Sequence, residues 1–190
     1  MERPLILKAE PDSRPVSEDL RRMLMELAAL TDKLTVEWTP PSDGPERPCV
    51  RVLRADGTDT GIAFHGVPGG HEFNSFVVGL YNAAGPGQSI DPALAEAIAA
   101  IDRPLDLQIV VALSCTMCPE LVIAAQKIAA SNPLVTAKVY DVNHFPELRE
   151  RYKIMSVPCL IINKAKVAFG KKTLGQLLEL LAEPEAGQTG

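Results

Sequence analysis

The chain has 190 residues, a hydrophobic fraction of 46% and a formal net charge of −5, which suits one large domain or two small ones with a well-filled core. The negative charge and the lack of a basic run disfavour nucleic acid as a partner. No apolar stretch reaches the length of about 18 residues that a membrane-spanning helix requires, so no membrane association is expected.

The first half of the chain predicts a unit of strands and two helices that ends near residue 84. One helix is expected from Ser17, a candidate N-cap, to about Lys33, with leucines on one face. A second helix, over residues 73–84, closes the unit. A turn at 55–57 makes the last two strands a hairpin. The expected strands are 4–9, 34–38, 49–54 and 61–64.

The second half predicts a similar order of elements. A segment rich in glycine and proline, 85–88, and a helix over 91–101 join it to the first half. The expected strands are 105–113, 134–140, 157–162 and 166–169, and the expected helices are 119–131, 145–152 and 173–181. The resulting order βαβαββα is that of the thioredoxin fold.

A Cys-x-x-Cys motif, Cys115-Thr116-Met117-Cys118, lies between the first strand and the first helix of the second half. This placement is typical of a thioredoxin-type redox site. We expect Cys115 at the helix N-terminus, where free N–H groups and the helix dipole favour a thiolate, and Cys118 one turn further in. Cys115 is then the attacking thiolate and Cys118 the resolving thiol. Thr116 and Met117, between them, are expected to contact the partner and to tune the redox potential.

A zinc site and a pair of inert thiols are the less favoured interpretations of this motif. Structural zinc needs a second close pair of ligands, and the other candidates form none: Cys49, Cys159, His65, His71 and His144. No metal and no bound cofactor is therefore expected. Oxidation should join Cys115 to Cys118 and leave Cys49 and Cys159 reduced, because only the first pair has a spacing that guarantees proximity. Cys159 is interpreted as a small buried hydrophobic residue, with a third redox thiol as the alternative.

Pro158 opens a predicted strand, where a proline cannot donate a backbone hydrogen bond. We expect a cis Val157–Pro158 bond facing the dithiol, as in thioredoxin-like proteins, with a trans proline as the alternative. Val157 and Pro158 would then present backbone to an incoming extended chain.

The first half is interpreted as a degenerate copy of this unit, because residues 10–15, where the dithiol would sit, hold no cysteine. The predicted fold class is α/β: two tandem thioredoxin-like folds with a central mixed sheet flanked by helices, of which only the second has an intact Cys-x-x-Cys. The predicted bounds are 1–86 and 87–184 for the two folds and 185–190 for a polar tail.

Two segments resemble the amino-terminal domain of the flavoprotein subunit of alkyl hydroperoxide reductase. They are Gly66-Val67-Pro68-Gly69-Gly70-His71-Glu72-Phe73-Asn74-Ser75 and Leu113-Ser114-Cys115-Thr116-Met117-Cys118-Pro119. The resemblance covers nearly the whole chain. It implies a carrier that takes electrons from a flavoprotein disulfide reductase and passes them to a peroxiredoxin. No Gly-x-Gly-x-x-Gly follows, so FAD and NAD(P)H are expected only on a separate partner reductase.

Glu72 is the candidate catalytic residue of the first half. The resemblance suggests that the turn at 69–72 faces the dithiol, where a carboxylate could take the proton from Cys118. The alternative is an exposed acid at the start of a helix, which the helix dipole favours. His71 is interpreted as a structural hydrogen-bonding residue.

Two other functions remain open at this point. A general protein disulfide reductase or isomerase would usually keep a dithiol in both halves, and a non-catalytic docking module would make the two cysteines incidental. Four cysteines with one close pair are typical of a cytosolic dithiol protein, and the first residues show no apolar core of a signal peptide. We therefore expect a cytoplasmic thiol–disulfide oxidoreductase.

Overall fold

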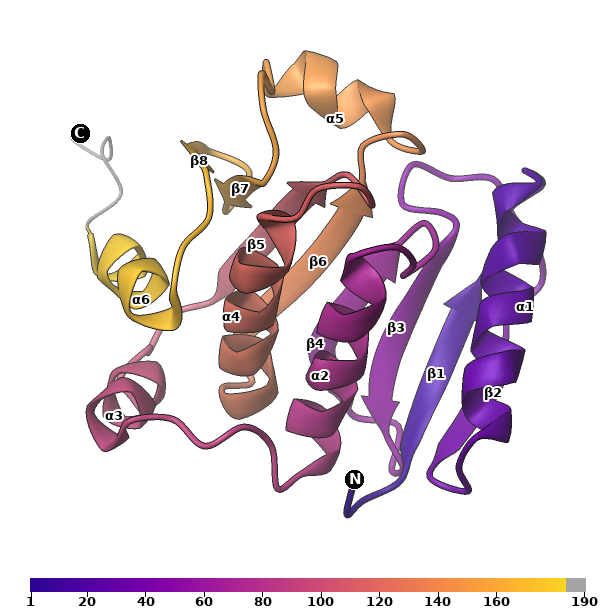
Figure 1. Cartoon of the computed structure of the whole chain (residues 1–190), viewed down its shortest axis with the longest axis horizontal. Coiled ribbons are helices and arrows are strands. Elements are labelled where there is room, and N and C mark those ends of the chain that lie inside the picture. The colour runs from indigo at the N-terminus through magenta and orange to yellow at the C-terminus, as the bar shows by residue number, and fades with distance from the viewer. Residues whose placement is uncertain (184–190) are drawn as a thin grey trace.

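Within residues 1–183, which this computed structural model describes, eight strands form one sheet in the order β2-β1-β3-β4-β6-β5-β7-β8 (Figure 1). The strands are β1 (Leu5–Glu10), β2 (Leu34–Trp38), β3 (Cys49–Arg54), β4 (Asp59–His65), β5 (Leu105–Val111), β6 (Val135–Asp141), β7 (Cys159–Ile162) and β8 (Lys166–Phe169). The helices are α1 (Val16–Ala29), α2 (Glu72–Ala84), α3 (Pro92–Ala99), α4 (Cys118–Ser131), α5 (Pro146–Arg151) and α6 (Leu174–Ala182).

The two halves of the chain repeat one sheet topology. The strand order is 2-1-3-4 in the first half and 6-5-7-8 in the second. In each half the first two strands are parallel and the other neighbours are antiparallel. A parallel pair, β4 with β6, joins the halves. The prediction of two tandem thioredoxin-like folds is confirmed. Their bounds remain predictions, and residues 184–190, which include the predicted tail, lie outside the described residues.

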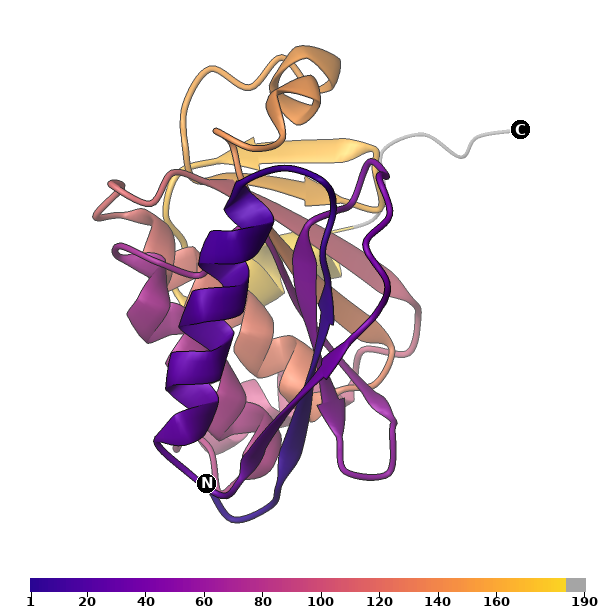
Figure 2. The same cartoon turned by 90° about the vertical axis from the view of Figure 1, so that its right-hand side faces the viewer.

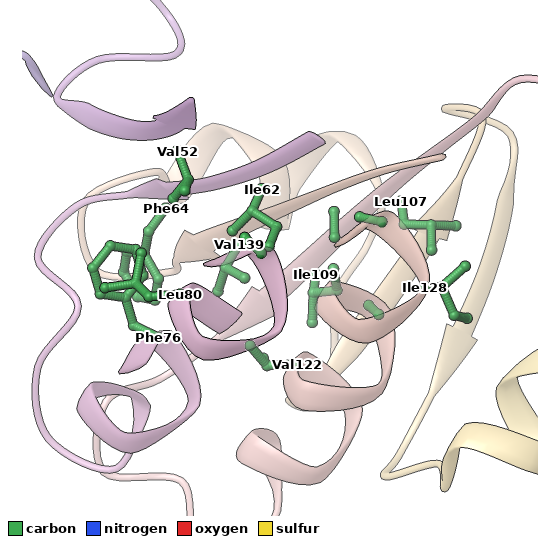
Figure 3. Close-up of a cluster of buried hydrophobic side chains, with 14 of the residues drawn as sticks. Val52, Ile62, Phe64, Phe76, Leu80, Leu107, Ile109, Val122, Ile128 and Val139 are labelled. Carbon is green, nitrogen blue, oxygen red and sulfur yellow. The ribbon is translucent and has the colours of Figure 1, made fainter. Parts of the chain in front are cut away.

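Helices α1, α2 and α4 lie on one face of the sheet (Figures 1 and 2). Side chains along a strand alternate between the two faces, so β1 is buried at every second position. The main core fills the space between this face and the helices, and Figure 3 shows it running from Phe64 on β4 to Ile109 on β5. A smaller cluster around Tyr140 and Phe145 includes residues of α5 and its flanking loops. Because Tyr140 follows Val139 of the main core, this cluster lies on the opposite face.

Helices α2 and α4 run side by side in the same direction (Figure 1). Just before α2, the His71 N–H donates to the Leu113 carbonyl oxygen at 3.0 Å, a few residues before α4. At the other end, Nζ of Lys127 on α4 donates at 2.9 Å to the carbonyl oxygen of Gln88, which follows α2. The first residues of the two helices, Glu72 and Cys118, therefore lie at the same end of the pair.

Gly79 allows α2 to pack closely against α4. A Cβ at this position would collide with the side-chain amide of Gln126, which is fully buried. We expect Gly79→Ala to lower the free energy of unfolding by about 1–3 kcal/mol, the usual range for an overpacked core. In a Gln126→Ala background the same change should raise it by up to about 1 kcal/mol, because alanine is the better helix former. Urea unfolding of the four proteins checks this, and equal effects in both backgrounds would contradict the packing argument.

Two features of α1 differ from the sequence-based expectation. Ser17 does not cap the helix: α1 begins at Val16, and the Ser17 hydroxyl donates to Asp12 Oδ1 at 2.7 Å, which holds the preceding turn. The helix ends at Ala29 instead of Lys33, because residues 30–33 turn the chain into β2. The other predicted elements agree with the structure to within about two residues at each end.

Candidate redox site

The turn between β5 and α4 carries the two cysteines of the motif. Its backbone is fixed by a hydrogen bond from the Cys115 N–H to the Ala112 carbonyl oxygen at 2.9 Å. Cys115 and Cys118 form a disulfide, with their Cα atoms 5.6 Å apart, while Cys49 and Cys159 are free and buried. The predicted pairing is thus confirmed.

The position of Cys118 within the helix corrects the prediction. Cys118 is the first residue of α4 and does not lie one turn in, and Cys115 precedes the helix by three residues. Pro119 occupies the second helical position. A backbone N–H in the first turn has no partner within the helix, so a proline there costs no hydrogen bond, and the helix can start just before it. Both sulfurs therefore lie near the N-terminus of α4, the positive end of its dipole.

The two sulfurs differ in accessibility. Cys118 is fully buried and Cys115 is half-buried, between the exposed residues Ser114 and Thr116. Met117 is also exposed, to 50%. A partner can reach Cys115 first, as the assignment of the attacking thiolate requires.

The Val157–Pro158 peptide bond is cis, as predicted. It places the Val157 carbonyl oxygen 4.0 Å from the Cys115 sulfur. The Pro158 carbonyl oxygen accepts a hydrogen bond from the Gly170 N–H at 3.0 Å, and β7 begins at the next residue, Cys159. The chain around Val157 therefore lies beside the dithiol.

The turn before α2 packs against the turn that carries the dithiol. Gly70 has a φ of 54°, and a Cβ there would collide with the Leu113 backbone. Leu113 lies two residues before Cys115. His71 itself is exposed, and its backbone N–H makes the contact with Leu113. The first fold thus reaches the site of the second through this turn.

Glu72 is fully buried at the start of α2, so the alternative interpretation, an exposed acid at a helix start, is wrong. Its Oε2 accepts a hydrogen bond from the Ser75 hydroxyl, and its Oε1 has no partner among residues 1–183. Burial raises the pKa of Glu72 to about 7, although the bond from Ser75 acts in the opposite direction. A carboxyl group with a pKa near neutral can take up and release a proton at physiological pH.

The region of the first fold that corresponds to the redox site is closed to an incoming chain, because the Arg14 side chain occupies it. Arg47–Pro48 is also cis, and Cys49 follows it as Cys159 follows Pro158. The Arg47 carbonyl oxygen, which corresponds to that of Val157, accepts a hydrogen bond from the Arg14 guanidinium. Arg14 also donates to the His144 carbonyl oxygen at 2.7 Å, in the second fold. This repeat is not among the features predicted above, although a proline–cysteine pair at the start of a strand occurs in both halves of the sequence.

In the described part of the chain, no three residues among the histidines, cysteines and acids are grouped to hold a metal ion. None of the helices within residues 1–183 is long and apolar enough to cross a membrane.

Comparison with known proteins matches residues 105–182 to a family model described as a thioredoxin domain. Over 97% of its length the chain is 32% identical to the F subunit of alkyl hydroperoxide reductase from Pseudomonas aeruginosa, and over 99% it is 31% identical to an NADH dehydrogenase from Ferdinandcohnia aciditolerans. The chain covers 34% and 36% of these two proteins, about a third of their length.

Solved structures show the same likeness. The chain matches the NTD_N/C domain of alkylhydroperoxide reductase AhpF from Enterococcus faecalis with a TM-score of 0.90 and 36% identity, covering 96% of this chain and 92% of that one. A protein disulfide oxidoreductase from Aeropyrum pernix matches with a TM-score of 0.80 and 20% identity, covering 95% and 85% of the two chains, which shows a shared fold only.

Proposed function

The chain belongs to the family of the amino-terminal domain of the alkyl hydroperoxide reductase flavoprotein AhpF, and from this we propose that it carries electrons from a flavoprotein disulfide reductase to a peroxiredoxin. The observation that carries the proposal is the disulfide between a half-buried Cys115 and a fully buried Cys118, beside the cis Val157–Pro158 bond. Such a pair accepts two electrons and passes them on by thiol–disulfide exchange.

The exchange with the peroxiredoxin has two steps. The Cys115 thiolate attacks one sulfur of the partner disulfide, a mixed disulfide forms, and the other partner sulfur leaves as a thiolate. Cys118 then loses its proton and attacks the Cys115 sulfur. The Cys115–Cys118 bond forms, and the partner is released with both its cysteines reduced. The reductase restores the dithiol by the reverse sequence.

Glu72 is the proposed acid–base group of the second step. It takes the proton when Cys118 becomes a thiolate and returns it when the disulfide is reduced again. Its burial, its pKa of about 7 and the common end that α2 and α4 share support this role.

Thr116, Met117, Val157 and Pro158 are the proposed contacts to the partner chain. An extended segment of the partner would lie along the backbone at Val157 and Pro158, next to Cys115. The exposed thioether of Met117, a flexible apolar group, would pack against the residues that flank the partner cysteine.

Replacing Met117 by Gln is expected to lower kcat/KM toward a protein disulfide by roughly tenfold, the effect of about 1.4 kcal/mol of lost apolar contact. The rate with a small aromatic disulfide, which lacks flanking residues, should change little. Met25→Gln is the matched control, because Met25 on α1 is 53% exposed and Met117 is 50% exposed. If Met117→Gln and Met25→Gln lower kcat/KM toward the protein disulfide to the same extent, Met117 does not contact the partner.

The closed first fold supports a dedicated carrier over a general disulfide reductase or isomerase. Residues 10–15 hold no cysteine, and Arg14 occupies the position that would receive a substrate chain. The fold shared with the protein disulfide oxidoreductase therefore does not favour that function here. A non-catalytic docking module would not need a disulfide at an accessible turn.

A coupled assay tests the proposal. The chain is combined with a flavoprotein disulfide reductase, a peroxiredoxin and a hydroperoxide, and NADH oxidation is followed. We propose that FAD and NAD(P)H act on the reductase only, since these 190 residues contain no dinucleotide fingerprint. NADH oxidation should depend on the chain and on the peroxiredoxin together, and an unchanged rate on omitting the chain would contradict the proposal. A cytoplasmic location remains a prediction.

A further inference from the structure

Glu72 and Ser75 form an isolated buried pair on the first turn of α2. Both side chains are fully buried, and the Ser75 hydroxyl lies within hydrogen-bond distance of Glu72 Oε2 and, at 3.0 Å, of the Glu72 carbonyl oxygen. A hydroxyl group has one hydrogen to donate. An ionised carboxylate is the stronger acceptor, so the hydrogen is directed to Oε2 whenever Glu72 is charged.

The two carboxyl oxygens of Glu72 therefore have different surroundings. Oε2 is held by Ser75, whereas Oε1 has no partner in the part of the chain that the structure describes. An oxygen fixed by a hydrogen bond is the poorer proton acceptor, because that bond would have to weaken first. Oε1 is left as the atom that can exchange a proton.

Few other ionisable groups surround this carboxyl. The strands packed against α2 turn apolar residues toward it: Leu5, Leu7, Ala9, Val50, Val52, Ile62 and Phe64. At the same end of α4 the ionisable residues are Cys115, Cys118 and Glu120, and Glu120 is at the surface, paired at 3.6 Å with Lys171. His71, next in the chain, is exposed, and Lys127 bonds at the far end of the helix pair.

We propose that Ser75 is a positioning residue for the exchange, which fixes Glu72 so that Oε1 receives the Cys118 proton and which sets the pH at which this happens. The inference rests on the proposed role of Glu72. Ser75 stabilises the ionised carboxylate and so partly offsets the effect of burial on its pKa. Without the hydroxyl, burial acts unopposed and Glu72 stays protonated to higher pH.

The test uses the reaction of the reduced protein with a symmetric aromatic disulfide. It follows the second phase, in which Cys118 attacks the mixed disulfide that Cys115 has formed. Ser75→Ala should move the midpoint of the pH–rate profile upward by roughly one unit and slow the reaction at pH 6 by up to about tenfold. Ser75→Thr, which keeps a hydroxyl, should restore the parent profile. In a Glu72→Gln background, Ser75→Ala should change nothing further. The 13C carboxyl shift of Glu72 should show the same movement of its titration midpoint.

The matched control is Ser17→Ala. Ser17 is also buried and also donates to a carboxylate, that of Asp12, but it lies on α1 and not on α2. Its loss should destabilise the protein without moving the pH–rate profile. An unchanged midpoint in Ser75→Ala, an equal shift in Ser17→Ala, or a shift that persists with Glu72→Gln would each overturn the inference.

The two proposals can fail separately. If Glu72→Gln alone leaves the second phase unchanged at every pH, the role of Glu72 is wrong, and with it the exchange that Ser75 would serve. If Glu72→Gln slows that phase while Ser75→Ala moves neither the kinetic nor the NMR midpoint, only the role of Ser75 is wrong. Should Ser75→Ala not fold, Ser75→Val matches the shape of Ser75→Thr without its hydroxyl, and comparing these two variants gives the same result.

Discussion

The Cys115→Ser variant is expected to lose electron transfer to a protein disulfide completely. Cys118 is fully buried, so no accessible thiolate remains to attack the partner. The Cys118→Ser variant should behave differently, because Cys115 can still attack but nothing resolves the product. It should accumulate a covalent mixed disulfide with the peroxiredoxin, seen as a reducible band at the summed mass on a non-reducing gel.

The two variants together assign the roles of the cysteines. Trapping by Cys115→Ser and not by Cys118→Ser would reverse the attacking and resolving assignments. A Cys115–Cys159 or Cys118–Cys159 bond in peptide maps of the oxidised parent would instead make Cys159 a third redox thiol. The structure leaves Cys159 free and buried, and burial raises its pKa to about 11, which disfavours its thiolate.

Glu72→Gln is expected to slow the resolving step by roughly a hundredfold or more at neutral pH, the usual contribution of a fully used general acid–base group. The amide cannot take a proton from Cys118, although it fills the same space and can still accept a hydrogen bond from Ser75. Stopped-flow exchange measured between pH 5 and 9 should show a pH dependence near 7 in the parent and none in the variant. Identical profiles would make Glu72 a structural residue only.

The same substitution should also change stability, with a definite sign. Burial raises the folded-state pKa of Glu72 from 4.5 to about 7. The folded protein then holds this proton more tightly than the unfolded chain, so the contribution to stability is complete below pH 4.5 and is lost as pH rises through 7. Because glutamine does not titrate, Glu72→Gln does not lose stability in this way as the pH rises. Its stability relative to the parent should therefore increase between about pH 4.5 and pH 8 by up to roughly 3 kcal/mol.

Urea unfolding of the oxidised proteins at pH 5 and pH 8 measures this difference. The comparison isolates the titration of Glu72, because glutamine has nearly the same volume as glutamate and the disulfide is kept intact in both proteins. A stability difference that is the same at both pH values would show that Glu72 titrates normally, and its proton could not then serve the dithiol near pH 7.

Local sequence patterns were sufficient to predict the order of the elements and the dithiol. Strand and helix periodicity located each element, and the spacing of Cys115 and Cys118 led directly to their disulfide. Pro158 at the start of a strand, together with the Cys-x-x-Cys motif 40 residues earlier, predicted the cis bond. These features follow from short motifs, which a sequence displays directly.

The burial of Glu72 could not be predicted in this way. An acid at a helix start is usually exposed, and this one is buried only because α2 packs parallel to α4, a helix that begins more than 40 residues later. The capping role expected for Ser17 failed for a local reason: α1 begins at Val16, and the Ser17 hydroxyl donates to Asp12, five residues earlier. The closure of the first fold by Arg14 depends on His144, in the other half of the chain.

A single-turnover transfer tests the central claim most directly. The reduced chain is mixed with an equal amount of oxidised peroxiredoxin, quenched with an alkylating reagent at intervals, and both proteins are mapped by mass spectrometry. We predict that one Cys115–Cys118 disulfide appears for each peroxiredoxin disulfide that is lost, with Cys49 and Cys159 alkylated only after unfolding. A peroxiredoxin that stays oxidised while the dithiol remains reduced would contradict the proposed carrier function.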